Sequence, residues 1–218
     1  MNESRKLVLV GGGGHCKAVI DVALSAGREI LGILDASIPE GSHVIGIPVL
    51  GNDNMISSII EKYGSSVEFI ITVGQLESSE IRHKIADNIT RAGGSFCEPM
   101  ISACAHVAAS AKIGRGTVIM HKVVVNSDAQ VGENCIINTG AIIEHDCKVG
   151  SFTHVSTGSI ANGTCTIGDD CFIGSRTVLV NNVSITDDVM TSAGSLINHD
   201  LEIAGIYCGA PARLARKK

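Results

Sequence analysis

Aliphatic residues recur at every sixth position through the C-terminal half of the chain. The series starting at Ile101 and ending at Ile203 is branched aliphatic throughout, except at Ala161 and Thr191. Positions four residues further on are nearly all small. A hexapeptide period is typical of a parallel β-helix, in which each hexad makes one short strand and a turn. We therefore expect about six coils of three hexads each, wound left-handed, with the aliphatic side chains inside.

Four of the eight cysteines lie in the column of small residues, namely Cys135, Cys147, Cys165 and Cys171. A column that faces a tight interior favours small, apolar side chains, and a buried free thiol behaves as one. The sequence has no CxxC pair and no secretory signal. We expect free thiols in the core rather than disulfides or a zinc site.

The N-terminal half alternates strand-like and helix-like segments. The pattern predicts strands at 6–10, 30–34 and 69–73 and helices at 15–26, 55–63 and 79–92. Ser78 or Ser79 is a candidate N-cap of the last helix, which Gly93 and Gly94 would end. Such alternation implies βαβ units and a parallel sheet. We predict an α/β half-Rossmann domain at 1–98 and the β-helix domain at 99–218.

Composition narrows the function classes. The net charge is −5 and the pI about 5.9, so the chain has no basic field to attract nucleic acid. No apolar stretch approaches the roughly 20 residues of a membrane span. The first residues do not have the layout of a signal peptide. We expect a cytoplasmic protein that binds neither nucleic acid nor membrane.

A glycine loop, Gly11 to Gly14, lies between the first strand and the first helix. Free backbone N–H groups and the helix dipole make such a loop a phosphate site. Asp35 ends the second strand, near the spacing of an acid that binds a ribose or base. Cys16 occupies the position of the last glycine of a dinucleotide fingerprint. A nucleoside diphosphate is therefore a better candidate ligand than NAD.

The coil length brings His145 next to Gly163. Residues 18 apart lie one above another, so the backbone N–H of Gly163 is a candidate oxyanion donor beside the imidazole. Glu144 and Asp146 flank His145, and either could fix its tautomer. His154 is half a coil away, on a different face of the prism. The two histidines could cooperate only across a subunit contact, which three-fold closure would supply.

Three further histidines, His106, His121 and His199, also lie on hexad turns, where we expect them to be solvated. A zinc site of three histidines, as in β-helix proteins resembling the gamma-type carbonic anhydrases, is an alternative. No two of these histidines have a short ligand-like spacing, and two carboxylates crowd His145. We expect no metal.

Three segments together carry a family resemblance: Gly-Gly-Gly-Gly-His-Cys-Lys at 11–17, Leu34-Asp35, and the run from Ile137 to Cys147 that contains Glu144-His145-Asp146. With them the chain resembles the bacterial nucleotide-amino-sugar N-acetyltransferases of surface-glycan biosynthesis, a family that includes sialic acid O-acetyltransferases. The resemblance continues through His154-Val155-Ser156 and the closing Gly209-Ala210-Pro211-Ala212-Arg213.

The resemblance implies a homotrimer with sites between subunits, acetyl-CoA as donor and a nucleotide-linked amino sugar as acceptor. By matching segments, His145 is the expected general base, oriented by Asp146. The implied cosubstrate contacts are His154, Gly163, Ser175 and Ala193. The implied sugar-nucleotide contacts are Gly13, Gly14, His15, Asp35, Gly74, Arg82 and Asn138. Arg213, Arg216, Lys217 and Lys218 are candidate contacts for the phosphates of coenzyme A.

Two alternatives remain open at this point. A sialic acid O-acetyltransferase would use the same fold and the same His145. A trimeric scaffold could instead bind a nucleotide sugar without turning it over, although it would not need the Glu144-His145-Asp146 cluster beside Gly163.

Overall fold

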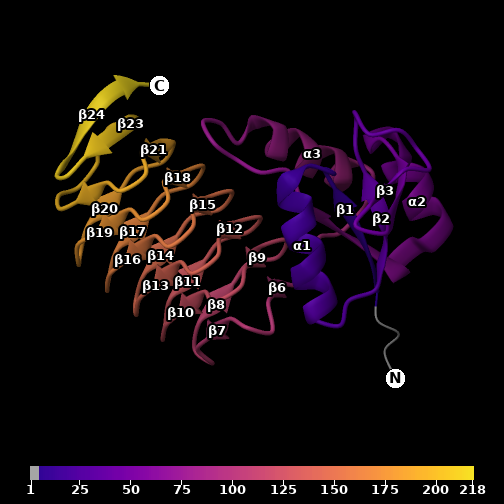
Figure 1. Cartoon of the computed structure of the whole chain (residues 1–218), viewed down its shortest axis with the longest axis horizontal. Coiled ribbons are helices and arrows are strands. Elements are labelled where there is room, and N and C mark those ends of the chain that lie inside the picture. Colours follow the sequence, from indigo (N-terminus) through magenta and orange to yellow (C-terminus); the bar gives the residue numbers. More distant parts are fainter. Residues whose placement is uncertain (1–4) are drawn as a thin grey trace.

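A computed structural model describes residues 5–218 as two parts that lie side by side (Figure 1). The N-terminal part is a five-stranded sheet in the order β3-β4-β2-β1-β5. Its strands are β1 Lys6–Val10, β2 Ile30–Leu34, β3 His43–Val44, β4 Ile47–Gly51 and β5 Val67–Ile71. All neighbouring pairs are parallel except β3 with β4. The half-Rossmann prediction is confirmed.

The helices are α1 Gly14–Ser25, α2 Ile56–Tyr63 and α3 Glu80–Arg91, with single 3-10 turns at Asp53–Met55 (η1) and Gly64–Ser66 (η2). The side chain of Ser78, one of the two candidate caps, accepts a hydrogen bond from the backbone N–H of Glu80, 3.1 Å away. The β3–β4 hairpin was not expected from the sequence. It adds an edge to the sheet beside β2.

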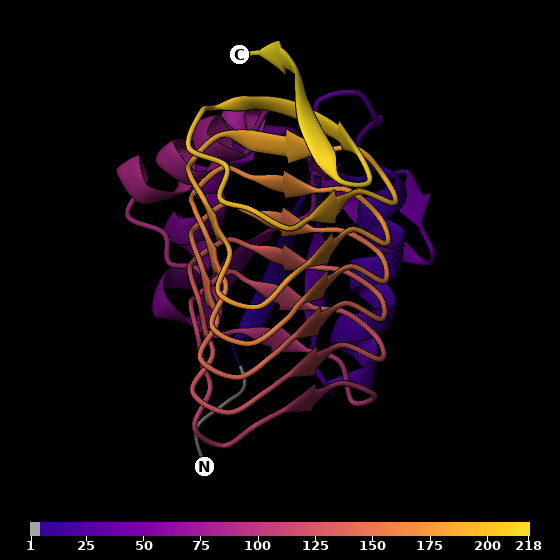
Figure 2. The same ribbon diagram turned by 90° about the vertical axis from the view of Figure 1, so that its left-hand side faces the viewer.

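From residue 100 the chain winds into a left-handed parallel β-helix with a triangular cross-section (Figure 2). One side, the domain-facing sheet, holds β6 Met100–Ile101, β9 Val118–Ile119, β12 Ile136–Ile137, β15 His154–Val155, β18 Phe172–Ile173, β21 Val189–Thr191, β23 Gly205–Gly209 and β24 Ala212–Lys217. The apolar-faced sheet holds β7 His106–Val107, β10 Val124–Val125, β13 Ile142–Ile143, β16 Ile160–Ala161, β19 Val178–Leu179 and β22 Leu196–Ile197. The polar-faced sheet holds β8 Lys112–Ile113, β11 Gln130–Val131, β14 Lys148–Val149, β17 Thr166–Ile167 and β20 Ser184–Ile185.

The last residue of each short strand from β6 to β22 belongs to the predicted series, which ends in this regular form at Ile197. The interior side chains are buried from Ile119 onward and half-buried in the first coil, and coils pair in register at a separation of 18 residues, as Ile137 does with Val155. The cysteines of the small column are free and fully buried, as expected. Burial of these stacked aliphatic and thiol groups is the main source of stability of the prism.

The repeat ends earlier than the sequence suggested. Ile203, the last member of the series, is 48% exposed and lies outside every strand. The reason is that Leu201, rather than Ile203, forms a bridge with Ile185 in the coil below. The chain then forms β23, and β24 turns back antiparallel to it. The basic C-terminal segment is therefore a strand rather than a loose tail.

The N-terminal part covers the outer surface of the domain-facing sheet. The outward side chains of Val118 and Ile136 are fully buried there, although they point away from the prism interior. Helix α1 lies against β6 at this contact. Among residues 5–218, no helix is long and apolar enough to cross a membrane.

Candidate active site

The glycine loop owes its shape to close packing against the sheet. Gly11 has a φ of +110°, and a Cβ at this position would lie 2.5 Å from Cγ2 of Val73. Gly13 precedes α1 without any side-chain cap, so the first N–H groups of the helix are open to a ligand. A Cβ on Gly13 or Gly14 would meet nothing within 4 Å. The loop therefore leaves free space at a helix N-terminus, as a phosphate site needs.

Asp35 fixes this loop. Its Oδ2 accepts a hydrogen bond from the N–H of Gly12 at 2.6 Å, and its Oδ1 accepts from Ser37 and Ile38. Partial burial acts to raise the pKa of Asp35, but the three backbone donors outweigh it and lower the pKa. The carboxylate stays ionised at neutral pH and holds the end of β2 against the glycine loop.

A cavity of about 680 Å³ opens beside this loop, between the two parts of the chain. Its lining includes Gly13, Gly14, His15, Asp35, Gly74, Asn138 and His154. The structure thus brings together six of the residues expected at the sugar nucleotide, and it adds His154, which was expected at the cosubstrate. A second cavity of about 400 Å³ shares Gly13 and Gly14 and is bounded by Lys17 and the β3–β4 hairpin.

His154 is held on the cavity wall by two hydrogen bonds. Its Nδ1 donates to the backbone oxygen of Gln75 at 2.9 Å, and its Nε2 accepts from Nδ2 of Asn138 at 3.0 Å. Burial lowers the pKa of His154 to about 4, so the ring is neutral at pH 7. The Gln75 carbonyl selects the tautomer, because a carbonyl oxygen can only accept. His154 therefore orients Asn138 toward the cavity.

His15 is a second buried histidine in the same cavity. Burial lowers its pKa to about 3, with smaller contributions from Arg82 and His154. Its Nε2 has no hydrogen-bond partner within the described chain. A neutral ring nitrogen in this position is free to pair with a polar group of a ligand.

Arg82 does not join the residues around the cavity. It is fully buried, and its guanidinium donates to the backbone oxygens of Val73, at 2.6 Å, and Asn134. Arg82, on α3, is thus enclosed by the loop after β5 and the turn between β11 and β12, where a ligand phosphate has no access. The structure gives this arginine a role in joining the two parts of the chain, which differs from the expected substrate contact.

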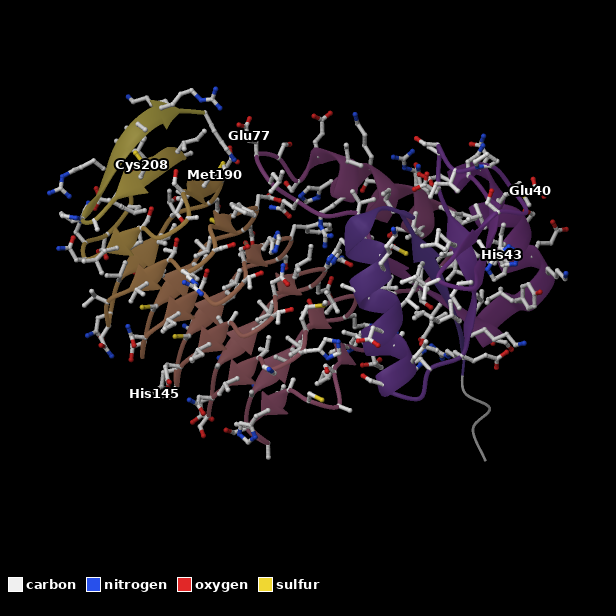
Figure 3. All side chains as sticks on the ribbon, in the orientation of Figure 1. Glu40, His43, Glu77, His145, Met190 and Cys208 are labelled. Carbon is white, nitrogen blue, oxygen red and sulfur yellow. The ribbon has the colours of Figure 1, made fainter. Side chains whose placement is uncertain are left out.

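His145 lies on the opposite side of the prism, on the corner between the apolar-faced and polar-faced sheets (Figure 3). Its Nδ1 is 2.8 Å from Oδ2 of Asp146. Since the carboxylate accepts, Nδ1 carries the proton and Nε2 keeps its lone pair. The hydrogen bond to Asp146 raises the pKa of His145. An exposed imidazole of this kind is suited to accept a proton from a bound nucleophile.

Gly163 lies directly beside this ring in the next coil, as the 18-residue period predicts. A Cβ on Gly163 would come within 2.6 Å of Nε2 and 2.7 Å of Cε1 of His145. Glu144 does not compete for the ring, because its Oε2 accepts a hydrogen bond from Asn126 at 2.6 Å. The imidazole and the glycine backbone thus form a compact pair on the corner.

Ser175 and Ala193 lie on a different corner, between the domain-facing and apolar-faced sheets, the same corner that carries Asn138. Ser175 is within 2.9 Å of the hydroxyl of Ser156. The column 157, 175 and 193 contains small residues, which leave room along that edge. In one chain the small-residue column is therefore next to the cavity, whereas His145 is on another edge.

Sequence reasoning missed Gln75 and Leu76, which line the cavity from the loop after β5. The general rule that ligands bind at the carboxyl ends of parallel strands could have pointed to this loop. Residues 5–218 contain no group of three or more His, Cys, Asp or Glu side chains arranged to hold a metal ion.

Two family models match the chain. The PglD N-terminal domain matches residues 6–89, and the GMPPB C-terminal domain matches residues 101–202. The chain is 35% identical over 111 residues to "Uncharacterized protein L142" of Acanthamoeba polyphaga mimivirus. That match covers 51% of this chain and only 20% of the viral protein, so the chain spans about a fifth of this relative.

Solved structures match over almost the whole chain. The acetyltransferase domain of PglB from Neisseria gonorrhoeae is 30% identical, with a TM-score of 0.88, over 96% of this chain and 99% of that one. PerB from Caulobacter crescentus, solved in complex with CoA and GDP-perosamine, is 28% identical, with a TM-score of 0.87, over 96% of each chain. WeeI from Acinetobacter baumannii is 20% identical and shares the fold, with a TM-score of 0.84 over 96% of this chain and 99% of its own.

Proposed function

The chain belongs to the family of bacterial nucleotide-amino-sugar N-acetyltransferases, and on that premise we propose that it acetylates the amine of a nucleotide-linked amino-deoxy sugar with acetyl-CoA. The observation that carries the proposal is the cavity in which a helix N-terminus and its glycine loop face Asn138 and His154 of the β-helix. PerB, a similar structure, holds CoA and GDP-perosamine. The acceptor proposed here is a 4-amino-4,6-dideoxy sugar.

Residues 1–98 bind the nucleotide sugar in this proposal, and residues 99–218 carry out the acetyl transfer. The open N–H groups at Gly13 and Gly14 take the diphosphate, and Asp35 lies near the ribose or base. Asn138 is on the opposite wall, where its amide faces the sugar.

A neighbouring subunit completes the site. The apolar-faced sheet presents an outward ladder of half-buried side chains: Val124, Ile142, Ile160, Val178 and Leu196. The polar-faced sheet instead presents Lys112, Gln130, Lys148, Thr166 and Ser184. An apolar ladder on one of three faces favours packing of prisms side by side. We place three chains around a three-fold axis, with His145 of each next to the cavity of its neighbour.

The chemistry is a direct acyl transfer. Nε2 of His145 takes a proton from the sugar amine while the amine nitrogen forms a bond to the thioester carbonyl carbon. The backbone N–H of Gly163 donates to the oxyanion that develops. The C–S bond then breaks, and the thiol of CoA leaves with the proton held by His145. Asp146 orients the imidazole and stabilises its protonated form through the hydrogen bond to Nδ1.

The cosubstrate fits the remaining features. Ser175 and Ala193 line the edge beside the cavity, where their small side chains leave space for the pantetheine arm. We place His154 with the Gly163 amide at the acetyl thioester. Arg213 and Arg216 of β24, exposed at the end of the coil, are suited to the phosphates of CoA. We further propose that the reaction takes place in the cytoplasm, where acetyl-CoA and sugar nucleotides are available, and that it belongs to surface-glycan biosynthesis.

A thiol-release assay with acetyl-CoA tests the proposal. The acceptor panel consists of UDP-, dTDP- and GDP-linked 4-amino-4,6-dideoxy sugars, with free and CMP-linked sialic acid. Turnover of one amino sugar supports the N-acetyltransferase and identifies its nucleotide. Activity on sialic acid alone would replace it with an O-acetyltransferase. No turnover of any acceptor, with tight binding of a sugar nucleotide, would point to a scaffold.

A further inference from the structure

One buried polar atom in the cavity has no partner and is not used by the function described so far. Gln75 lines the cavity from the loop between β5 and α3, and its side chain is only 3% exposed. A buried glutamine normally satisfies both ends of its amide, because an unpaired buried polar atom costs roughly 1–3 kcal/mol. Among the described residues, Oε1 of Gln75 has no hydrogen-bond partner.

The rest of Gln75 is firmly held, so the orientation of its amide is defined. Nε2 donates to the backbone oxygen of Cys171 at 3.3 Å and, more weakly, to that of Asp170 at 3.5 Å. Carbonyl oxygens cannot donate, so this end of the amide must be the nitrogen. The backbone oxygen of Gln75 accepts from Nδ1 of His154. Oε1 is therefore an acceptor in a fixed position, already removed from water.

The nature of the atom limits what can pair with it. A carbonyl oxygen accepts only from N–H or O–H groups, whereas phosphates and thioesters at neutral pH offer acceptors. Asn138 is held at both ends, because its Nδ2 donates one hydrogen to His154 and its Oδ1 accepts from the N–H of Thr139 at 2.8 Å, and the second hydrogen of Nδ2 remains free for a ligand acceptor. The sugar ring carries such donors in its amine and hydroxyl groups, and the nucleotide carries them in its ribose hydroxyls and base N–H groups. The sugar is the nearer of the two in the proposed function, because Gln75 is hydrogen-bonded to His154, which in turn holds Asn138 on the wall assigned to the sugar.

We propose that Oε1 of Gln75 accepts a hydrogen bond from the sugar ring of the bound substrate and thereby selects a sugar with a donor at that position. The inference rests on the proposed function. Because the fold has already desolvated this acceptor, the new hydrogen bond is formed without a further cost of stripping water from it. Gln75 thus contributes to affinity for the sugar, not for the nucleotide.

The test is Gln75→Met, which keeps the length of the side chain and the backbone oxygen that holds His154. Binding is measured calorimetrically with GDP-, UDP- and dTDP-linked 4-amino-4,6-dideoxy sugars and with GDP, UDP and dTDP alone. We expect the affinity for the sugar nucleotide that wild type binds to fall about tenfold. The affinity for the matching nucleotide should stay unchanged. The control is Glu77→Gln, two residues along the same loop, where the exposed side chain pairs with Arg216 and does not line the cavity; the binding measurements contain no CoA, so this pair does not affect them.

An analogue with hydrogen in place of the amine separates the two possible donors. Equal binding of this analogue by wild type and Gln75→Met assigns the bond to the amine, and a persistent tenfold difference assigns it to a ring hydroxyl. An equal loss on sugar nucleotide and on nucleotide would overturn the inference, since Gln75 would then act on the cavity as a whole. Unchanged affinity of Gln75→Met for both the sugar nucleotide and the nucleotide would also overturn it. If wild type binds none of the three sugar nucleotides, the proposed function fails first and this inference fails with it.

Discussion

Gly163 and His145 occupy the same corner of consecutive coils, and the ring of the histidine lies where a Cβ of residue 163 would be. The distance from that Cβ position to Nε2 is 2.6 Å, closer than real side-chain contacts allow. The backbone of Gly163 is not in the positive-φ region, so glycine is needed here for space rather than for backbone freedom. The pair therefore tolerates no side chain at position 163.

Gly163→Ala should displace the imidazole without disturbing the coil. A shift of about 1 Å at a catalytic group can lower the rate roughly 100-fold, so we expect kcat to fall by up to that factor. Steady-state kinetics with acetyl-CoA and the accepted sugar nucleotide measure it. In a His145→Ala background the same change should add nothing, because the group it displaces is already gone. If Gly163→Ala lowered kcat by the same factor with and without His145, the proposed coupling of the two residues would be contradicted.

His145→Ala should lower kcat by roughly 10²–10⁴, the range attributed to general-base catalysis. The KM values should change much less, since a general base acts on the proton that moves in the transition state and not on the binding of either substrate. The reaction is measured at saturating concentrations of both substrates. Retention of most of the turnover would refute the assignment of this histidine as the base.

Asp146→Asn should move the acidic limb of the pH profile. The hydrogen bond to Asp146 raises the pKa of His145, and the base works only when unprotonated, so wild-type activity is lost as pH falls through this raised value. With asparagine the pKa returns toward that of ordinary histidine. The acidic limb of kcat/KM should therefore shift to lower pH, with a lower plateau because the tautomer is less well fixed. A limb at the same pH would show that another group controls the profile.

The two buried histidines should make the fold sensitive to acid. Burial lowers the pKa to about 3 for His15 and about 4 for His154, below the ordinary value of 6.5. Between these values the unfolded chain binds more protons, so stability falls as pH drops below 6.5. At pH 5 each histidine accounts for a loss of about 2 kcal/mol.

Chemical denaturation at pH 7 and pH 5 measures that loss. His15→Asn should reduce the difference between the two pH values, because one of the two groups that must be buried neutral is removed. His199→Asn, at an exposed turn, is the matched control. An unchanged difference in His15→Asn would show that His15 is accessible to protons in the folded state.

Ile160→Asp should dissociate the assembly. Ile160 lies in the middle of the outward ladder of the apolar-faced sheet, where a carboxylate could not be buried against another prism. Sedimentation should show single chains, and activity should fall by roughly 10²–10⁴, as after loss of the base, because each cavity loses the His145 of its neighbour. Thr166→Asp, on the polar-faced sheet, should change neither property. A monomeric wild-type protein would contradict the proposed trimer.

The β-helix could be predicted nearly residue by residue because its period is written in one chain segment. The aliphatic residue of a hexad points into the prism regardless of the rest of the chain. The strands from Met100–Ile101 to Leu196–Ile197 therefore followed directly from the spacing. The same logic placed Gly163 beside His145. The prediction that Ile203 lies inside the prism was wrong, because the last coil is shorter and Leu201 pairs with Ile185 instead. The hexapeptide period does not indicate such a local change.

Contacts between the two parts of the chain could not be predicted. Gln75 and His154 are 79 positions apart, and Arg82 and Asn134 are 52 apart. No spacing rule relates residues of a βαβ unit to residues of a coil. A buried arginine and a phosphate-binding arginine also look the same in sequence. Both contacts depend on how α3 and the loop before it pack against the domain-facing sheet, which is a feature of the tertiary structure.

The antiparallel strand β24 has a consequence for solubility. A stack of parallel coils offers backbone N–H and C=O groups at its last turn, where a further coil or another molecule could add and extend it into a fibre. In this chain β24 pairs with β23 in the reverse direction and carries Arg213, Arg216 and Lys217 on its exposed residues. Reversed polarity and repelling cations make this end a poor template. The strand thereby terminates growth of the coil and protects the protein from end-to-end polymerisation.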